Sequence, residues 1–167
     1  MFKKTIKIMD WISYALLIVF SSAMVISTFL QVIFRYLFNH PLFWSEELSR
    51  YCFVWIVFVG AAIAMKQGAH IGVDYFVMKL PSRFKNFLRI VINILIISFL
   101  VIIIKQSIFV VIVNMSQYSP AIRIPMGLIY LAIPVGLSLM LGYVIIMNYQ
   151  LLKSILSYQG KRRQEIK

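Results

Sequence analysis

Acidic residues, histidine and cysteine are all scarce in this sequence. It holds five Asp+Glu, two His and one Cys among 167 residues. A lone thiol cannot form an internal disulfide or a cysteine metal cluster, so Cys52 is interpreted as a small buried apolar side chain. The sequence also contains no Ser/His/Asp set, phosphate-binding loop or Cys-x-x-Cys pair. We therefore expect neither an enzyme nor a protein that binds a cofactor or a metal.

Apolar residues are abundant instead. They make up 62% of the chain, and the mean hydropathy is +0.89. Because a soluble protein is nearer half apolar, this composition predicts a bilayer as the solvent. The net charge of +12 comes from basic residues at the edges of long apolar runs, which favours lipid headgroups over nucleic acid as their partner. The apolar run after Lys3, Lys4 and Lys7 is too long for a signal peptide and lacks a cleavage site, so we expect a retained first helix.

Four apolar runs predict four membrane-spanning helices, at about 11–34, 45–65, 88–113 and 125–151. The second run is uncharged only from Tyr51 to Met65, which is too short to span, so its helix is expected to begin earlier. Ser45 is expected as the N-cap of the second helix, with Glu46 and Glu47 in its first turn. Pro125 suits the first turn of the fourth helix, and Pro134 should kink it. The expected fold is one all-α membrane domain over residues 1–167. The polar connection 66–89 could hold a short interfacial helix, and residues 35–45 could form a loop or a surface helix.

The basic residues also predict the orientation. Three lie in the N-terminal segment, five in 66–89 and five in the C-terminal tail, whereas the two opposite segments hold only Arg35, Arg50 and Arg123. The positive-inside rule then places both termini in the cytoplasm. In this topology His40 and His70 lie on opposite sides of the membrane, so they cannot share a haem or a metal.

The densest polar cluster is Arg35 to Arg50, on the predicted outer side. Glu46 and Arg50 have the i, i+4 spacing and orientation that favour a helical ion pair. One interpretation is a well-capped helix start at the membrane surface. The other is a partner interface with partly desolvated ion pairs, since such pairs are costly without partners. The candidate interface residues are Arg35, Trp44, Glu46, Glu47, Arg50, Trp55, Gly60, His70 and Asp74.

The stretch from Arg35 to Pro81 carries an ordered series of short motifs. They are Phe34-Arg35-Tyr36, Trp44-Ser45-Glu46-Glu47-Leu48-Ser49-Arg50-Tyr51, Phe53-Val54-Trp55, Gly60-Ala61, His70-Ile71 with Val73-Asp74, and Leu80-Pro81. This series resembles the small membrane subunit of tripartite ATP-independent periplasmic (TRAP) transporters, the DctQ-like family. Tyr118-Ser119-Pro120, Pro125-Met126-Gly127-Leu128 and Pro134 are similar to the branch associated with sugar-acid uptake, a weaker match.

The resemblance implies a role as an accessory subunit in the bacterial inner membrane. Its partners would be a large permease subunit (DctM-like), whose scaffold it stabilises, and a periplasmic solute-binding protein (DctP-like). The assembly would take up a carboxylate-bearing solute, such as a C4-dicarboxylate, a sugar acid or sialic acid, driven by sodium. The alternative is an autonomous small carrier or exporter. Such carriers generally need a membrane-embedded acid, and no Asp, Glu, His or Arg lies deep in a predicted span.

Overall fold

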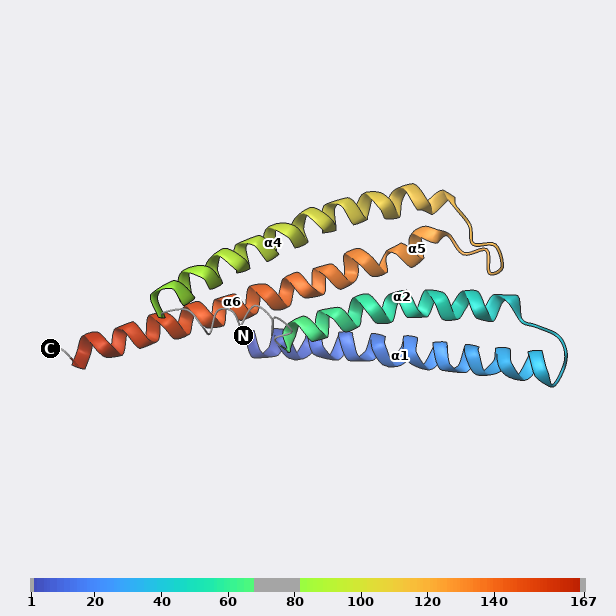
Figure 1. The fold of residues 1–167 in the computed structure, drawn as a ribbon, viewed down its shortest axis with the longest axis horizontal. Helices are drawn as coiled ribbons and strands as arrows, with labels where there is room; N and C mark the ends of the chain where they lie inside the picture. The colour runs from blue at the N-terminus through green and yellow to red at the C-terminus, as the bar shows by residue number, and fades with distance from the viewer. Residues whose placement is uncertain (1, 68–81, 166–167) are drawn as a thin grey trace.

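The computed structural model describes residues 2–67 and 82–165, which are helical apart from short connections (Figure 1). The long helices are α1 (Phe2–Tyr36), α2 (Phe43–Lys66), α4 (Ser82–Val113) and α6 (Ala132–Glu165). The short ones are the 3-10 turn η1 (Asn114–Ser116) and α5 (Met126–Tyr130). Four segments are long and apolar enough to cross a membrane: Lys4–Tyr36, Phe43–Lys66, Val91–Ser116 and Met126–Tyr149. The predicted all-α fold with four spans is confirmed.

The helices extend further than the uncharged runs do. α1 begins nine residues before the predicted span, and α4 begins at Ser82, so 82–89 are helical rather than part of a polar connection. The charge pattern marks where the hydrocarbon ends, whereas Lys and Arg are good helix formers that continue a helix into the headgroup layer. The segment between α1 and α2 is a short loop, in which Asn39 adopts a positive φ of 52°. No surface helix forms there.

The fourth span is interrupted where a proline requires it. α5 ends at Tyr130, and α6 begins at Ala132. Pro134 has no N–H to offer the Tyr130 carbonyl, and its ring would clash with that oxygen in a continuous helix. The predicted kink is therefore confirmed. Pro125 occupies the N-cap of α5 rather than its first turn, so that prediction was wrong by one position.

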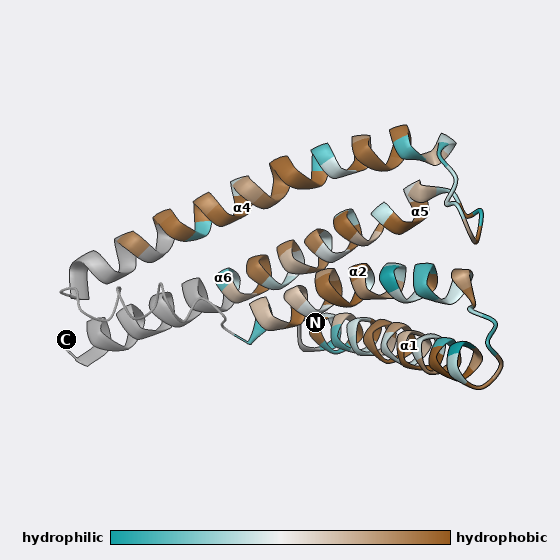
Figure 2. Ribbon diagram, turned by 45° about the vertical axis from the view of Figure 1, so that its right-hand side comes forward, coloured by the Kyte–Doolittle hydropathy of each residue, from teal (hydrophilic) through white to brown (hydrophobic). Residues whose placement is uncertain are grey.

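The four spans lie side by side in the order α1, α2, α6, α4 (Figures 1 and 2). α1 packs extensively only on α2, and α4 packs on α5 and α6; among the described residues, α1 and α4 make no contact. The fold is thus an open row rather than a closed four-helix bundle. Burial follows this order: 44% of the apolar segment in Met126–Tyr149 is buried, but only 6% of that in α1. The outer helices α1 and α4 each leave one side uncovered.

Close packing along the row depends on small residues at the crossings. A Cβ added to Gly136 would lie 2.7 Å from the Cβ of Phe58 and 2.8 Å from its carbonyl oxygen, so the backbones of α2 and α6 approach each other closely there. Ala62 of α2 is fully buried. Between α4 and α6, Leu100, Leu137 and Val144 form the buried apolar core.

Candidate functional site

The start of α2 carries an exposed ion pair. Arg50 donates to Glu46 at 3.2 Å, which confirms the predicted i, i+4 pair. The two side chains are 69% and 63% exposed. A pair this open to solvent contributes only about 0.3–0.5 kcal/mol to stability. Trp44 beside it is also exposed, so this surface is available to a partner.

Ser45 does not cap the helix, contrary to the prediction. The N-cap is Leu42, and it makes no side-chain capping bond. Ser45 is fully buried instead: its hydroxyl donates to the Leu42 carbonyl at 2.9 Å, and its own carbonyl accepts from Ser27 at 2.8 Å. One turn later, Thr28 and Ser49 are 3.1 Å apart. The hydroxyl groups therefore join α1 to α2, and only Glu46 lies in the first turn.

Glu47 has a different environment from its neighbour Glu46, since it is only 7% exposed. Its Oε2 accepts the backbone N–H groups of Ala121 and Ile122, each at 2.9 Å, and its Oε1 accepts the Tyr51 hydroxyl. Glu47 therefore forms no ion pair with an arginine within the described chain. It binds the connection between the third and fourth spans to the start of α2. No local pattern in the sequence indicates this contact, because the two segments are more than seventy residues apart.

The connection that Glu47 holds is a compact turn. Met126 N–H donates to Gln117 O at 2.8 Å, and Ser119 N–H donates to Ile124 O at 2.9 Å. Ser119 is buried and accepts Ile124 N–H on its hydroxyl. Arg123 adopts a φ of 58°, a left-handed conformation that the surrounding bonds must stabilise for a residue with a side chain. Together, Glu47 and the Ser119 hydroxyl give this turn one defined shape.

The remaining candidate residues have four different environments or placements. Arg35 is exposed in the last turn of α1. Trp55 stacks on Phe20, with ring centroids 4.9 Å apart and planes 15° apart, so it serves the α1–α2 contact. Gly60 has open space where a Cβ would be, so within this chain it brings no helix close. His70 and Asp74 lie outside the described residues.

A second polar cluster lies at the opposite ends of the helices, and the sequence analysis missed it. Lys66 donates to Asp10 Oδ2 at 2.7 Å, with side chains 32% and 21% exposed. The Tyr143 hydroxyl donates to Asp10 Oδ1 at 3.0 Å and lies 3.4 Å from Ser13 Oγ. These contacts join α1, α2 and α6. The signal available in the sequence was the opposite charge of Asp10, just before the first predicted span, and Lys66, just after the second.

One further polar contact joins the last two helices of the row. The Asn93 amide donates to the Asn148 side-chain oxygen, and Asn148 donates to the Val144 carbonyl at 3.0 Å. Polar side-chain contacts thus join α1 to α2 at one edge of the row and α4 to α6 at the other. Within a bilayer, an interhelical hydrogen bond contributes about 0.6–2 kcal/mol.

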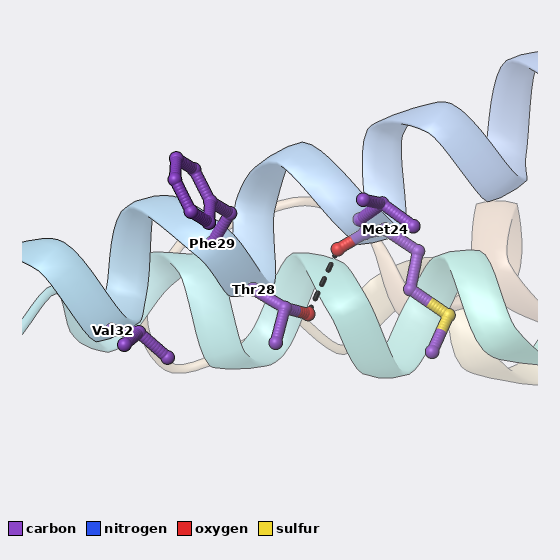
Figure 3. A pocket seen from close by; sticks show the side chains of 5 residues that line it. Met24, Thr28, Phe29 and Val32 are labelled. Carbon is purple, nitrogen blue, oxygen red and sulfur yellow. Dashed lines mark hydrogen bonds between the residues drawn. The ribbon is translucent and has the colours of Figure 1, made fainter.

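The exposed surface of α1 carries a shallow apolar groove (Figure 3). Met24, Val25, Thr28, Phe29 and Val32 line it. The one hydroxyl there, on Thr28, is bonded to the Met24 carbonyl at 2.8 Å. The groove has the chemistry of a lipid-facing or helix-facing surface and offers nothing that would bind a polar solute.

Comparison with known proteins assigns this arrangement to a transport system. Residues 24–154 match the family model of the DctQ component of tripartite ATP-independent periplasmic transporters. A Haemophilus influenzae protein designated a TRAP transporter small permease is 34% identical over 109 residues, which cover 65% of this chain and 68% of that protein. The C4-dicarboxylate TRAP transporter small permease protein DctQ of Vibrio cholerae is 39% identical over 82 residues, 49% of this chain and 35% of that protein.

A third relative is much longer than this chain. The isethionate TRAP transporter permease protein DctMQ of Oleidesulfovibrio alaskensis is 31% identical over 99 residues. These residues cover 58% of this chain but only 16% of that protein. The region similar to this chain is therefore a small part of that larger permease polypeptide.

Proposed function

The chain belongs to the DctQ component family of tripartite ATP-independent periplasmic transporters, and from this membership we propose that it partners a large permease subunit and stabilises that subunit's scaffold. It is a multi-pass inner-membrane protein and a transporter subunit rather than an enzyme. In the proposed assembly, a periplasmic binding protein delivers the solute, the large subunit carries it with sodium, and this chain remains static.

The observation that carries the proposal is the extent of the family match, which runs from the middle of α1 into α6. The packing supports a static role. Glu47 and the Ser27–Ser45 contact fix one end of the row, while the Asp10–Lys66 pair fixes the other. A row tied at both ends has little freedom to change the spacing of its helices.

The shape of the row supports a partner. An open row leaves one side of α1 and one side of α4 without a neighbouring helix, so a larger membrane protein can pack against one of these edges. The relative named DctMQ joins a region similar to this chain to a longer permease polypeptide. Both observations support a large membrane protein alongside the row. The exposed residues Arg35, Trp44, Glu46 and Arg50 and the half-buried Gly60 remain candidates for contact with it.

The proposed orientation places both termini in the cytoplasm. Four spans bring the two ends of the chain to the same side, and thirteen of the seventeen basic residues lie on that side. The loop 37–42 and the turn held by Glu47 would then face the periplasm, where a binding protein could contact them.

We propose an organic anion as the solute. Relatives of this chain are named for a C4-dicarboxylate, for sialic acid and for isethionate. The first two carry carboxylates and the third a sulfonate, so a carboxylate of the C4-dicarboxylate, sugar-acid or sialic-acid type is the first choice and a sulfonate belongs in the test panel.

The test is reconstitution. The chain is co-expressed with the large permease subunit of the same transporter, purified and placed in liposomes with the matching binding protein. We expect the two membrane subunits to purify together and the liposomes to accumulate one anion of the panel only under an inward sodium gradient. Two results would contradict the proposal: purification of the chain without the large subunit, or uptake or efflux by the chain alone, which would indicate an autonomous carrier.

A further inference from the structure

A charged residue lies on the uncovered side of α4. Lys105 and Gln106 are both exposed. Ser98, Ile102, Lys105 and Phe109 are spaced i, i+4, i+7 and i+11, so they share one helix face. That face lies opposite Leu100, Ser107 and Val111, the buried side of the helix. The row itself covers nothing on this face.

Lys105 also lies well inside the third candidate span, Val91–Ser116. It is eight residues before Val113, the last residue of α4, and fourteen after Val91, the start of the apolar span. At 1.5 Å per residue, these separations are about 12 and 21 Å. The Cα–Cβ bonds of a helix tilt toward its N-terminus, which here is the more distant end. A Lys105 side chain directed toward the nearer, C-terminal end of α4 spans only about half of the ~12 Å that separates Lys105 from Val113.

No described residue neutralises this charge. The hydrogen bonds and ion pairs of the described residues do not include Lys105. The three acids with described side chains are engaged elsewhere: Asp10 with Lys66, Glu46 with Arg50, and Glu47 with the turn at residues 117–126. Intramembrane charges usually face a protein or water-filled interior and pair there. The partner of Lys105 must therefore come from outside the described row.

The other edge of the row differs in this respect. α1 has no charged residue between Trp11 and Phe34. Its Ser27 and Thr28 hydroxyls are bonded to α2 or to their own helix, and its groove is apolar. The α1 edge thus has the chemistry of a lipid-facing surface, while the α4 edge carries an unneutralised cation.

We infer that the uncovered face of α4, with Lys105 at its centre, packs against a transmembrane helix of the large permease subunit, and that this helix supplies a carboxylate or another acceptor to Lys105. The inference rests on the proposed function and adds to it the edge at which the large subunit docks. Gln106, one residue on, offers a second polar contact at the same depth.

The first experiment measures the complex. The wild-type chain and variants are co-expressed with a tagged large subunit, and the chain retained after detergent purification is quantified. Lys105→Leu leaves the partner's acceptor unpaired, so we expect about tenfold less retained chain, in line with the energies of interhelical bonds in membranes. Lys105→Arg keeps the charge and should retain the chain. Val25→Leu on the exposed face of α1 is the matched control and should have no effect.

The second experiment needs no disruptive substitution. A photoreactive benzoylphenylalanine replaces either Phe109 on α4 or Phe29 on α1, two exposed aromatic residues. In native membranes, we expect a crosslink to the large subunit from position 109 and only lipid adducts from position 29. A lipid adduct alone at 109, a protein crosslink at 29, or full retention of the Lys105→Leu chain would overturn the inference. Failure of the wild-type chain to be retained at all would refute the proposed function instead.

Discussion

Replacing Glu47 with alanine removes the acceptor that ties the turn at residues 117–126 to α2. Glu47 Oε2 accepts two backbone amides at 2.9 Å, from Ala121 and Ile122. A hydrogen bond to a charged group contributes about 1.5–3 kcal/mol. Because Ala121 is exposed, water can take up part of that bonding after the substitution. We therefore take about 2 kcal/mol for the loss, which corresponds to about 30-fold faster local opening.

The neighbouring glutamate provides the control. Glu46 is exposed and pairs only with Arg50. Glu46→Ala should therefore lower the free energy of local opening by only about 0.3–0.5 kcal/mol, which corresponds to about twofold faster opening. Glu47→Gln keeps a carbonyl oxygen for the two amides but loses the charge, and it should lie between the two alanine variants. Glu46 and Glu47 are adjacent and have the same side chain, yet their alanine variants are expected to differ about fifteenfold in the rate of local opening.

Hydrogen–deuterium exchange of the chain in lipid nanodiscs measures this directly, because amide exchange reports the free energy of local opening. We expect the amides of residues 121 and 122 to exchange about 30-fold faster in Glu47→Ala, while those in the middle of α6 are unchanged. If exchange at 121 and 122 is the same in wild type and Glu47→Ala, or if Glu46→Ala has an equal effect, the assigned role of Glu47 is refuted.

Three further substitutions test the packing of the row by thermal unfolding in detergent. Asp10→Asn should lower stability by about 1 kcal/mol, since the pair with Lys66 is partly exposed. When Lys66→Met is already present, Asp10→Asn should lower stability little further; if the two losses of stability simply add, the ion pair is contradicted. Gly136→Ala should cost about 1–3 kcal/mol because its Cβ meets α2, whereas Gly60→Ala, in open space, should be neutral or slightly stabilising; equal effects would contradict the crossing. Asn148→Leu should cost about 1 kcal/mol by breaking the polar contact between α4 and α6, and an unchanged melting temperature would count against that contact.

Some features of the site followed directly from the sequence. The Glu46–Arg50 pair depends only on i, i+4 spacing within one helix, and the break before Pro134 depends on a missing N–H. Both are local, and both were predicted. The prediction of Ser45 as the N-cap was wrong because a hydroxyl group at a helix start can bond a carbonyl as well as an amide. Here α1 packs against Ser45, and the Ser45 hydroxyl bonds the Leu42 carbonyl.

Residues that meet across helices were harder to assign. Gly60 and Gly136 are both glycines in spans, yet only Gly136 brings two helices together. Asp10 and Lys66 were both visible in the sequence, but their pairing required α1 and α2 to be neighbours with matching ends. Trp55, a candidate for contact with another subunit, is engaged with Phe20 inside the chain.

By itself the sequence determined that the chain crosses the membrane four times, because every backbone polar group in hydrocarbon must be bonded within its own helix and each of the four predicted helices is long enough to span. The order of the helices in the row, the different environments of Glu46 and Glu47 and the isolation of Lys105 on the α4 edge were decided only by the tertiary structure. Lipid and neighbouring helices are equally apolar, so hydropathy cannot say which side of a helix meets which neighbour. That choice depends on side-chain shape and on polar contacts between residues far apart in the chain.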